Sequence, residues 1–299
     1  LILYHPSEAV VARALALFTR VRRKEVAPVV ERLLDHPSAR VRAAAVAALS
    51  VLAPDARSWR DRLAVEESPE VRARIEVHLM ASGELSGSEA QGRFDELAKR
   101  GSGSVRVAVS EAIAICQPDG FEQALGSLVR APESEVRCAA AYAIAQVHAV
   151  TLAPLVVPLL ADEGTREAAR AALLELEDGG FAALEQALAN EELPRTLRNE
   201  VPRALGLFEP QRAASLLLRR FAQEKDGMVR YRLLRSLEGL AARAPNLEFD
   251  RAILRDAIDR EVRRAYLHWD QRGVLARGAA EEPARDTPGH AFLLQMLDD

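Results

Sequence analysis

Aromatic residues and cysteine are scarce in this sequence, and both shortages limit the fold. Only 8 Phe, 4 Tyr and 2 Trp occur in 299 residues, whereas strands are usually rich in aromatic and β-branched side chains. Alanine and leucine are abundant instead, which favours helices. The two cysteines, Cys116 and Cys138, lie on neighbouring helices in the repeat register below, about 13 Å apart along the helix axes, and this is too far for a disulfide. We predict an all-helical protein with free thiols, typical of a reducing compartment.

Sequence patterns that carry chemistry are also missing. The six histidines are scattered, and no pair of them, nor of the cysteines, has the spacing of a metal site. The glycines at 101–103 are not followed by the lysine of a phosphate-binding loop, and no serine has the flanking glycines of a nucleophile elbow. The acids Glu175, Glu177 and Asp178 are interpreted as solvated helix ends. We therefore predict no catalytic residue, cofactor or metal.

Charge and hydropathy exclude two further classes. Residues 61–190 carry 11 basic and 21 acidic side chains, and this acidic middle argues against general binding to a phosphate backbone. Residues 138–161 contain no charge and are long enough for a membrane span. Polar residues and two prolines interrupt that run, so two short buried helices are the better interpretation. The sequence has no initiator Met and no signal peptide, and we expect a cytoplasmic piece of a longer chain.

One unit recurs along the chain, best seen in residues 36–49: a turn, a serine cap and an alanine-rich helix that opens on a Val-Arg pair. The second position of the pair returns at intervals of 29 to 34 residues. Its members are Val11, Arg42, Arg72, Arg106, Arg137, Arg166, Arg198 and Arg230. Three residues before the first member of each pair lies a column of which six members, the serines and aspartates, are good N-caps. The column is Ser7, Ser38, Ser68, Ser102, Glu133, Asp162, Pro194 and Asp226. These columns predict eight helices of one kind.

Apolar residues occupy every position four and eight residues after the first member of the pair. This spacing keeps them on one helical face, and apolar stripes between these helices predict a first helix for each unit. Each unit is then a helical hairpin that must stack on its neighbours to bury its apolar face. We predict an all-α, right-handed α-solenoid of about eight hairpins.

The predicted solenoid covers residues 1–272. Within it, an amphipathic helix over 253–269 carries Leu254, Ile258, Val262, Ala265 and Trp269 on one face, and we expect this helix to cap the last hairpin. Residues 273–289 contain three glycines and two prolines and are predicted to be a linker. Residues 290–299 are predicted to start a further helix that the end of the sequence cuts off.

Turn, cap, Val-Arg pair and alanine-rich helix at about 31-residue spacing resemble HEAT repeats of the short bacterial type, within the HEAT/armadillo class. More narrowly, Leu193–Leu205, Val229–Arg232 and Leu293–Leu297 resemble the HEAT segment attached to some bacterial ATP/ADP-translocase-like membrane carriers. That resemblance implies a cytoplasmic segment that regulates a transporter, with membrane helices upstream of Leu1. The broader resemblance to HEAT repeats implies a scaffold that binds other proteins.

The arginine column from Arg42 to Arg230 allows two interpretations. It could form a ladder that binds anions, or each arginine could pair with an acid of the preceding turn or of a neighbour. Bidentate, charge-assisted pairing suits arginine. Five acids are near enough in sequence to serve, namely Asp35, Glu67, Glu135, Asp162 and Asp226. We favour the structural interpretation.

In each predicted hairpin the alanine-rich helix that opens on the Val-Arg pair is the second helix. The candidate binding surface is the inner face of these second helices. Over the first six units its residues are small or apolar, so either close packing buries it or it lines an apolar concave groove. The groove interpretation predicts that an amphipathic helix or an extended segment with an acidic tail binds there, from another protein or from the parent chain. The predicted binding residues are Val77, Val107, Tyr142, Asn199, Arg203, Tyr231, Arg232 and Arg235.

Two alternatives come from other classes of HEAT-like protein. DNA glycosylases need a basic groove with aromatic residues, and the acidic, aromatic-poor middle of this chain argues against that function. Chromophore lyases are the enzyme alternative, and no residue pattern here supplies their chemistry. A non-enzymatic interaction module is the function that we predict.

Overall fold

The computed structural model describes residues 2–53, 59–85, 87–118 and 120–279. The chain forms two compact units, Leu1–Phe208 and Glu209–Asp299. The sequence predicts one solenoid over 1–272, and the apolar columns of its repeats continue from the first unit into the second.

Within the described residues the structure is all-helical, with no strand. The eight helices predicted from the Val-Arg columns are all present. They are α1 (Glu8–Val21), α3 (Ala39–Leu52), α5 (Pro69–Ala81), α7 (Gly103–Cys116), α9 (Ser134–Gln146), α11 (Arg166–Glu175), α13 (Arg195–Leu205) and α15 (Gly227–Arg243). We call these the second helices.

Several of the helices that alternate with them are short, and 3-10 segments flank some of them. The alternating helices comprise α2 (Ala27–Arg32), α4 (Trp59–Val65), α6 (Gly87–Arg100), α8 (Glu122–Leu128), α10 (Ala153–Val156), α12 (Glu177–Ala189) and α14 (Pro210–Gln223). The 3-10 segments are η1 (Ile2–Tyr4), η2 (Lys24–Val26), η3 (Leu33–Asp35), η4 (Val150–Leu152) and η5 (Val157–Ala161). Within the described part of the chain this alternation is consistent with the predicted α-solenoid.

Seven of the eight second helices begin directly after the predicted cap position, but only Ser68, Ser102 and Asp226 accept a hydrogen bond from the first turn through their side chains. The hydroxyls of Ser68 and Ser102 accept hydrogen bonds from first-turn N–H groups at 3.5 and 3.3 Å, and the Asp226 carboxylate accepts two such bonds. The helix α11 is the exception. It begins after Thr165, because the backbone at Asp162 turns before the helix starts, so the predicted cap at Asp162 is wrong.

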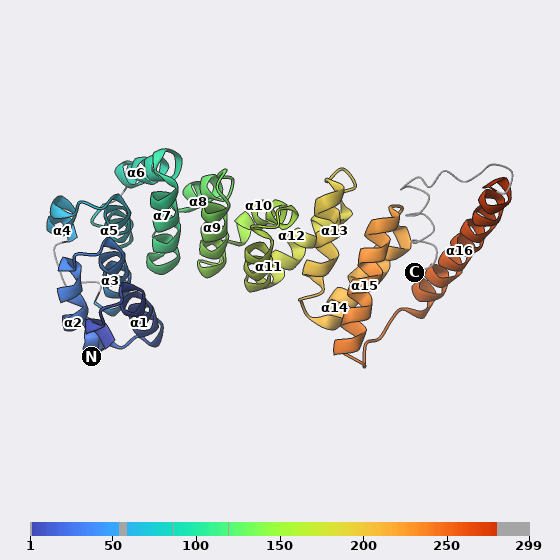
Figure 1. The fold of residues 1–299 in the computed structure, drawn as a ribbon, viewed down its shortest axis with the longest axis horizontal. Helices are drawn as coiled ribbons and strands as arrows, with labels where there is room; N and C mark the ends of the chain where they lie inside the picture. The colour runs from blue at the N-terminus through green and yellow to red at the C-terminus, as the bar shows by residue number, and fades with distance from the viewer. Residues whose placement is uncertain (1, 54–58, 86, 119, 280–299) are drawn as a thin grey trace. The chain divides into compact units, whose positions relative to one another are not determined.

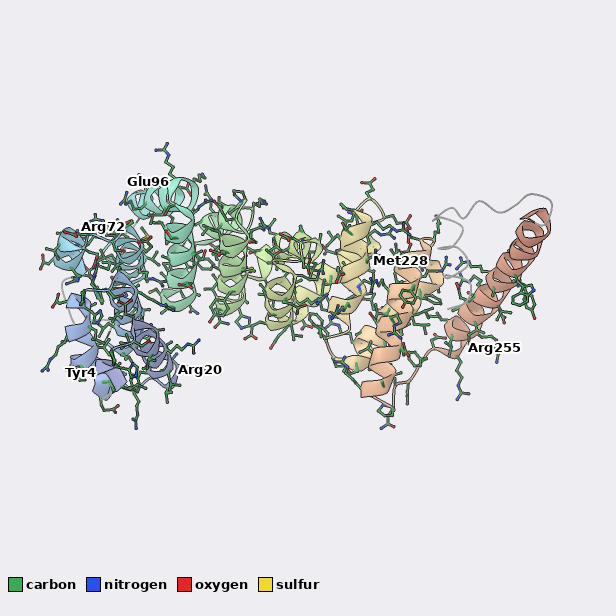
Figure 2. All side chains as sticks on the ribbon, viewed as in Figure 1. Tyr4, Arg20, Arg72, Glu96, Met228 and Arg255 are labelled. Atoms are coloured by element: carbon green, nitrogen blue, oxygen red, sulfur yellow. The ribbon has the colours of Figure 1, made fainter. Side chains whose placement is uncertain are left out.

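In the first unit the second helices from α1 to α11 lie side by side in chain order (Figure 1). The residues of the apolar columns form the interface, and Val41, Ile75, Val109 and Ile144 are fully buried. Charged side chains such as Arg20 extend from the outside (Figure 2). The core is therefore a continuous layer that successive hairpins extend.

The second unit contains α14, α15 and α16 (Arg251–Ala279). Both α15 and α16 pack on α14, and Ala257 of α16 is buried. The apolar stripe predicted to cap the last hairpin is largely uncovered, since Ile258 is 53% and Trp269 is 74% exposed. The helix also extends to Ala279, so the linker predicted from residue 273 is wrong for 273–279, and residues 280–299 lie outside the described residues.

Candidate interaction surface

The arginine column is structural, as Arg137 illustrates. Its guanidinium donates to the carbonyl oxygens of Ala131 and Pro132 at 3.0 and 2.6 Å, and it also pairs with Asp162 before the next second helix. Arg137 thus caps carbonyls in the turn before its own helix and links its hairpin to the following one. Arg137 is therefore engaged by groups of the protein and does not belong to an exposed ladder that binds anions.

The same links recur at other positions of the column. They are Arg42–Glu66, Arg106–Glu133, Arg166–Glu200 and Arg230–Glu261, at 2.7, 2.5, 3.6 and 3.4 Å. The structural interpretation is confirmed, although most of the acids differ from those predicted. Asp35, for example, pairs with Arg62 at 2.6 Å. Sequence spacing could not identify these partners because they lie about one repeat away.

The predicted inner groove is closed at the third helical repeat, which contains α5. Val77 is fully buried, which corrects its prediction as a binding residue. The cause is that α3 and α7 contact each other across α5, and the Cys116 sulfur of α7 lies 4.0 Å from Nδ1 of His78 on α5. All residues from Ile75 to Met80 are buried in consequence. His78 lies among them, with its ring 4.7 Å from that of Trp59.

On α7, α9 and α11 the inner face is open to different extents. Tyr142 of α9 is 54% exposed, and Leu174 of α11 is 40% exposed. Ala171 is exposed, while Val107 and Cys138 are half-buried. We call these five residues the α9 patch, because they occupy one face of three second helices that contact one another in order.

Charges beside the α9 patch are acidic. Glu111 pairs with Arg74, and the exposed Glu167 pairs with Arg170, which is itself buried. Arg170 also binds Glu200 at 2.5 Å. The patch therefore combines an apolar centre with carboxylates at its edge.

The remaining predicted binding residues are divided between the two compact units. In the first unit, Arg203 is exposed and Asn199 is half-buried. In the second unit, Tyr231 is 51% exposed, and Arg232 and Arg235 are exposed. Arg235 pairs with Glu238 at 2.6 Å. Tyr231 and the two arginines are thus accessible on α15, as predicted, but they belong to a different unit from Tyr142.

Burial raises the pKa of both cysteine thiols, and it does so strongly for Cys116. Both cysteines are free. The pKa of Cys116 is raised to about 11, and the Cys138 sulfur lies 3.5 Å from the carbonyl oxygen of Gly164. Since only the thiolate is nucleophilic, we expect iodoacetamide to modify Cys138 at least about tenfold faster than Cys116 at pH 8.

Mass spectrometry of the variants Cys116→Ala and Cys138→Ala measures each rate separately. The rate for Cys116 should keep rising up to about pH 11, and it should match that of Cys138 in denaturant. Equal rates in the folded chain would show that Cys116 is not shielded.

Metal sites and membrane-spanning helices are two further features to consider among the described residues. Histidine, cysteine and acidic side chains gather nowhere in groups of three that could hold a metal ion, as far as the structure describes them. Among the same residues, no helix is both long and apolar enough to cross a membrane.

Comparisons with known proteins give one family. The family model for the HEAT repeat matches residues 26–56, which include α2 and α3. No curated protein matches the chain. A crystal structure of an engineered protein is similar at 20% identity and a TM-score of 0.29, with 73% of this chain and 97% of that one covered. Residues 26–56 are therefore a HEAT repeat, and the all-helical structure around them is consistent with a HEAT-repeat protein.

Proposed function

We propose that this chain is a non-enzymatic interaction module that binds a helix or an extended segment of another protein on the α9 patch. HEAT repeats commonly mediate protein–protein interaction, and residues 26–56 match that family. The observation that carries the proposal is the exposure of Tyr142, 54%, on a helix whose neighbouring Ala141 and Ala143 are fully buried. A large exposed aromatic side chain on a rigid, packed helix is a typical anchor for a partner.

The chemistry of the patch indicates what it binds. The apolar centre requires apolar side chains of the partner, and the carboxylates Glu111 and Glu167 at its edge are already paired with Arg74 and Arg170, so they favour neither charge on the partner. An amphipathic segment that lays its apolar face on the patch meets this condition. Regulation of a fused membrane transporter stays a prediction from the sequence resemblance.

Site-specific crosslinking tests the location of binding. A photoreactive benzoyl-phenylalanine at position 142 should crosslink a partner from an extract of the source cells. The same group at Tyr4, which is 66% exposed outside the patch, is the matched control (Figure 2). Crosslinks of equal yield and identity at both positions would contradict the proposal.

Once the crosslinked partner is identified, Tyr142→Asp should weaken its binding by about thirtyfold or more, the loss typical of an aromatic anchor. Tyr4→Asp should leave the affinity unchanged, and both variants should keep the thermal stability of the parent because both side chains are exposed. Tyr231→Asp tests the second unit separately.

A further inference from the structure

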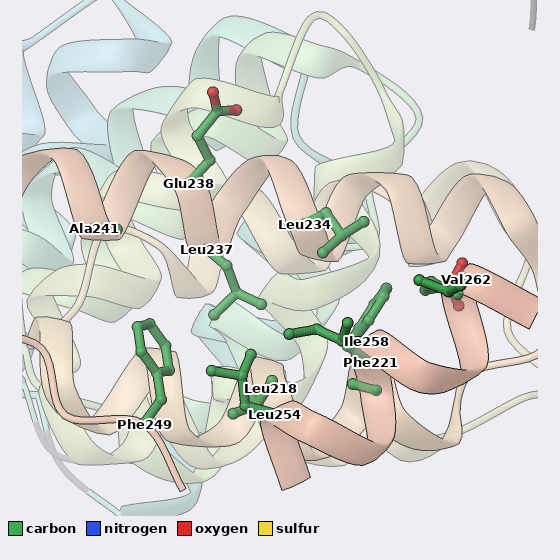
Figure 3. A pocket seen from close by; sticks show the side chains of 12 residues that line it. Leu218, Phe221, Leu234, Leu237, Glu238, Ala241, Phe249, Leu254, Ile258 and Val262 are labelled. Atoms are coloured by element: carbon green, nitrogen blue, oxygen red, sulfur yellow. The ribbon is translucent and has the colours of Figure 1, made fainter. Parts of the chain in front are cut away.

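The second unit contains an apolar groove that the proposed function does not use. It has a volume of about 470 Å³ and lies among α14, α15 and α16. Leu218 and Phe221 of α14 form its floor, Leu234 and Leu237 of α15 one wall, and Ile258 and Val262 of α16 the other. Figure 3 shows Leu237 of α15 directed toward α14 and α16, whereas Glu238 of α15 points away from them.

The floor of the groove is buried, whereas its walls remain open. Leu218 and Phe221 are 4% and 6% exposed, but Leu234, Ile258 and Val262 are 44%, 53% and 48% exposed. Open apolar walls over a buried apolar floor are the geometry that accepts an apolar helix or segment.

The charges at the groove edge are already paired. Glu238 binds Arg235 at 2.6 Å, and Glu261 binds Arg230 and Arg264 at 3.4 and 2.5 Å. An occupant therefore needs no charge of its own, and a charged one would gain little from this edge.

The chain contains a segment that fits this requirement. Residues 291–297, Ala-Phe-Leu-Leu-Gln-Met-Leu, have one polar side chain and no charge. We propose that residues 291–297 occupy the groove among α14, α15 and α16, so that the end of the sequence covers the apolar wall of α16.

The length of the connection permits this return. From Val262 to Ala279 the helix α16 advances about 26 Å, at about 1.5 Å a residue. Residues 280–290 can extend about 36–40 Å, at about 3.3–3.6 Å a residue. The tether therefore reaches the level of Val262 with length to spare. It also places the segment near the groove at an effective concentration that a free peptide attains only at about millimolar levels.

Competition with a free peptide tests the proposal. The probe is a fluorescein-labelled peptide of residues 289–299, and its binding is measured by fluorescence anisotropy. The variant Phe292→Asp/Leu294→Asp should leave the groove open and bind the peptide at least tenfold more tightly than the unmodified chain. Equal binding to both, or binding to neither, would overturn the proposal.

Two further substitutions in that double variant locate the bound peptide. Ile258→Asp, and separately Leu234→Asp on the opposite wall, should abolish peptide binding. Tyr266→Asp is the matched control, because Tyr266 is 74% exposed on the same helix and does not line the groove. Circular dichroism shows whether each variant keeps its helices.

Light scattering distinguishes the other occupant, which is the same segment of a second copy. The proposal predicts that Phe292→Asp/Leu294→Asp does not change the molecular mass of the particle. A dimer of the unmodified chain that these substitutions dissociate would overturn the tethered arrangement in favour of exchange between copies. None of these measurements depends on the α9 patch, so this proposal and the proposed function fail independently.

Discussion

Gly180→Ala should destabilise the first unit by about 3 kcal/mol or more, the upper part of the range for overpacking. Gly180 lies in α12 where this helix crosses the end of α11, and a Cβ atom there would be 1.8 Å from the carbonyl oxygen of Leu173. That oxygen belongs to the backbone, so no side-chain rotation relieves the contact and the two helices must separate. Thermal unfolding followed by circular dichroism measures the loss.

The matched control is the same substitution at Gly92 in α6 of the same unit. A Cβ at Gly92 meets no atom within 4 Å, and alanine is the better helix former, so Gly92→Ala should stabilise by about 0.4–1 kcal/mol. Unchanged stability of Gly180→Ala would show that α11 and α12 are not as close as described.

Glu66→Ala should have the second largest effect, a loss of about 2–4 kcal/mol. Glu66 is 4% exposed, and its carboxylate accepts hydrogen bonds from Arg42 at 2.7 Å and from Arg62 at 3.3 Å. It also accepts the backbone N–H of Ser68 at 3.0 Å. Truncation would leave two partly buried guanidinium groups without this partner.

Glu67→Ala provides the control, since Glu67 is the adjacent residue and is exposed. We expect its stability to change by less than about 0.5 kcal/mol. Denaturant unfolding of both variants separates the loss of the ion pair from the loss of any glutamate in this turn, and equal effects would contradict the assignment.

The same carboxylate predicts a dependence on pH. Burial alone would raise the pKa of Glu66, but the hydrogen bonds from Arg42 and Ser68 and the charge of Arg42 outweigh it and lower the pKa. A lowered pKa in the folded state means that the unfolded chain binds more protons, so the stabilisation is present above about pH 4.5 and decreases as the pH falls below it. Glu66→Gln should lose stability less steeply than the unmodified chain over that acidic range.

The helices were predictable because each one repeats a local signal. Two apolar positions recur in every repeat and an arginine in seven of the eight, and both hydrogen bonding and burial depend on those positions within one hairpin. The position of Asp162 shows the limit, since the extra turn before Thr165 replaces the cap there.

Contacts between non-adjacent helices were not predictable. Val77 occupies the same column as Tyr142, yet Val77 is fully buried and Tyr142 is 54% exposed. The difference depends on the approach of α3 to α7 across α5, and no residue of α5 signals that approach. The exposed stripe of α16 has the same origin, because amphipathicity identifies an apolar face without identifying what covers it.

The arginine links described above limit how such an array can change in length. Arg137 satisfies carbonyls of its own hairpin and the Asp162 carboxylate of the following one. Removal of the repeat that contains Arg137 would bring Arg106, the preceding arginine of the column, to the same position relative to Asp162. Deletion of a segment that is not a whole repeat would place a guanidinium beside a turn that lacks its acidic partner. Lengthening or shortening by complete units is therefore the change that this bonding scheme tolerates.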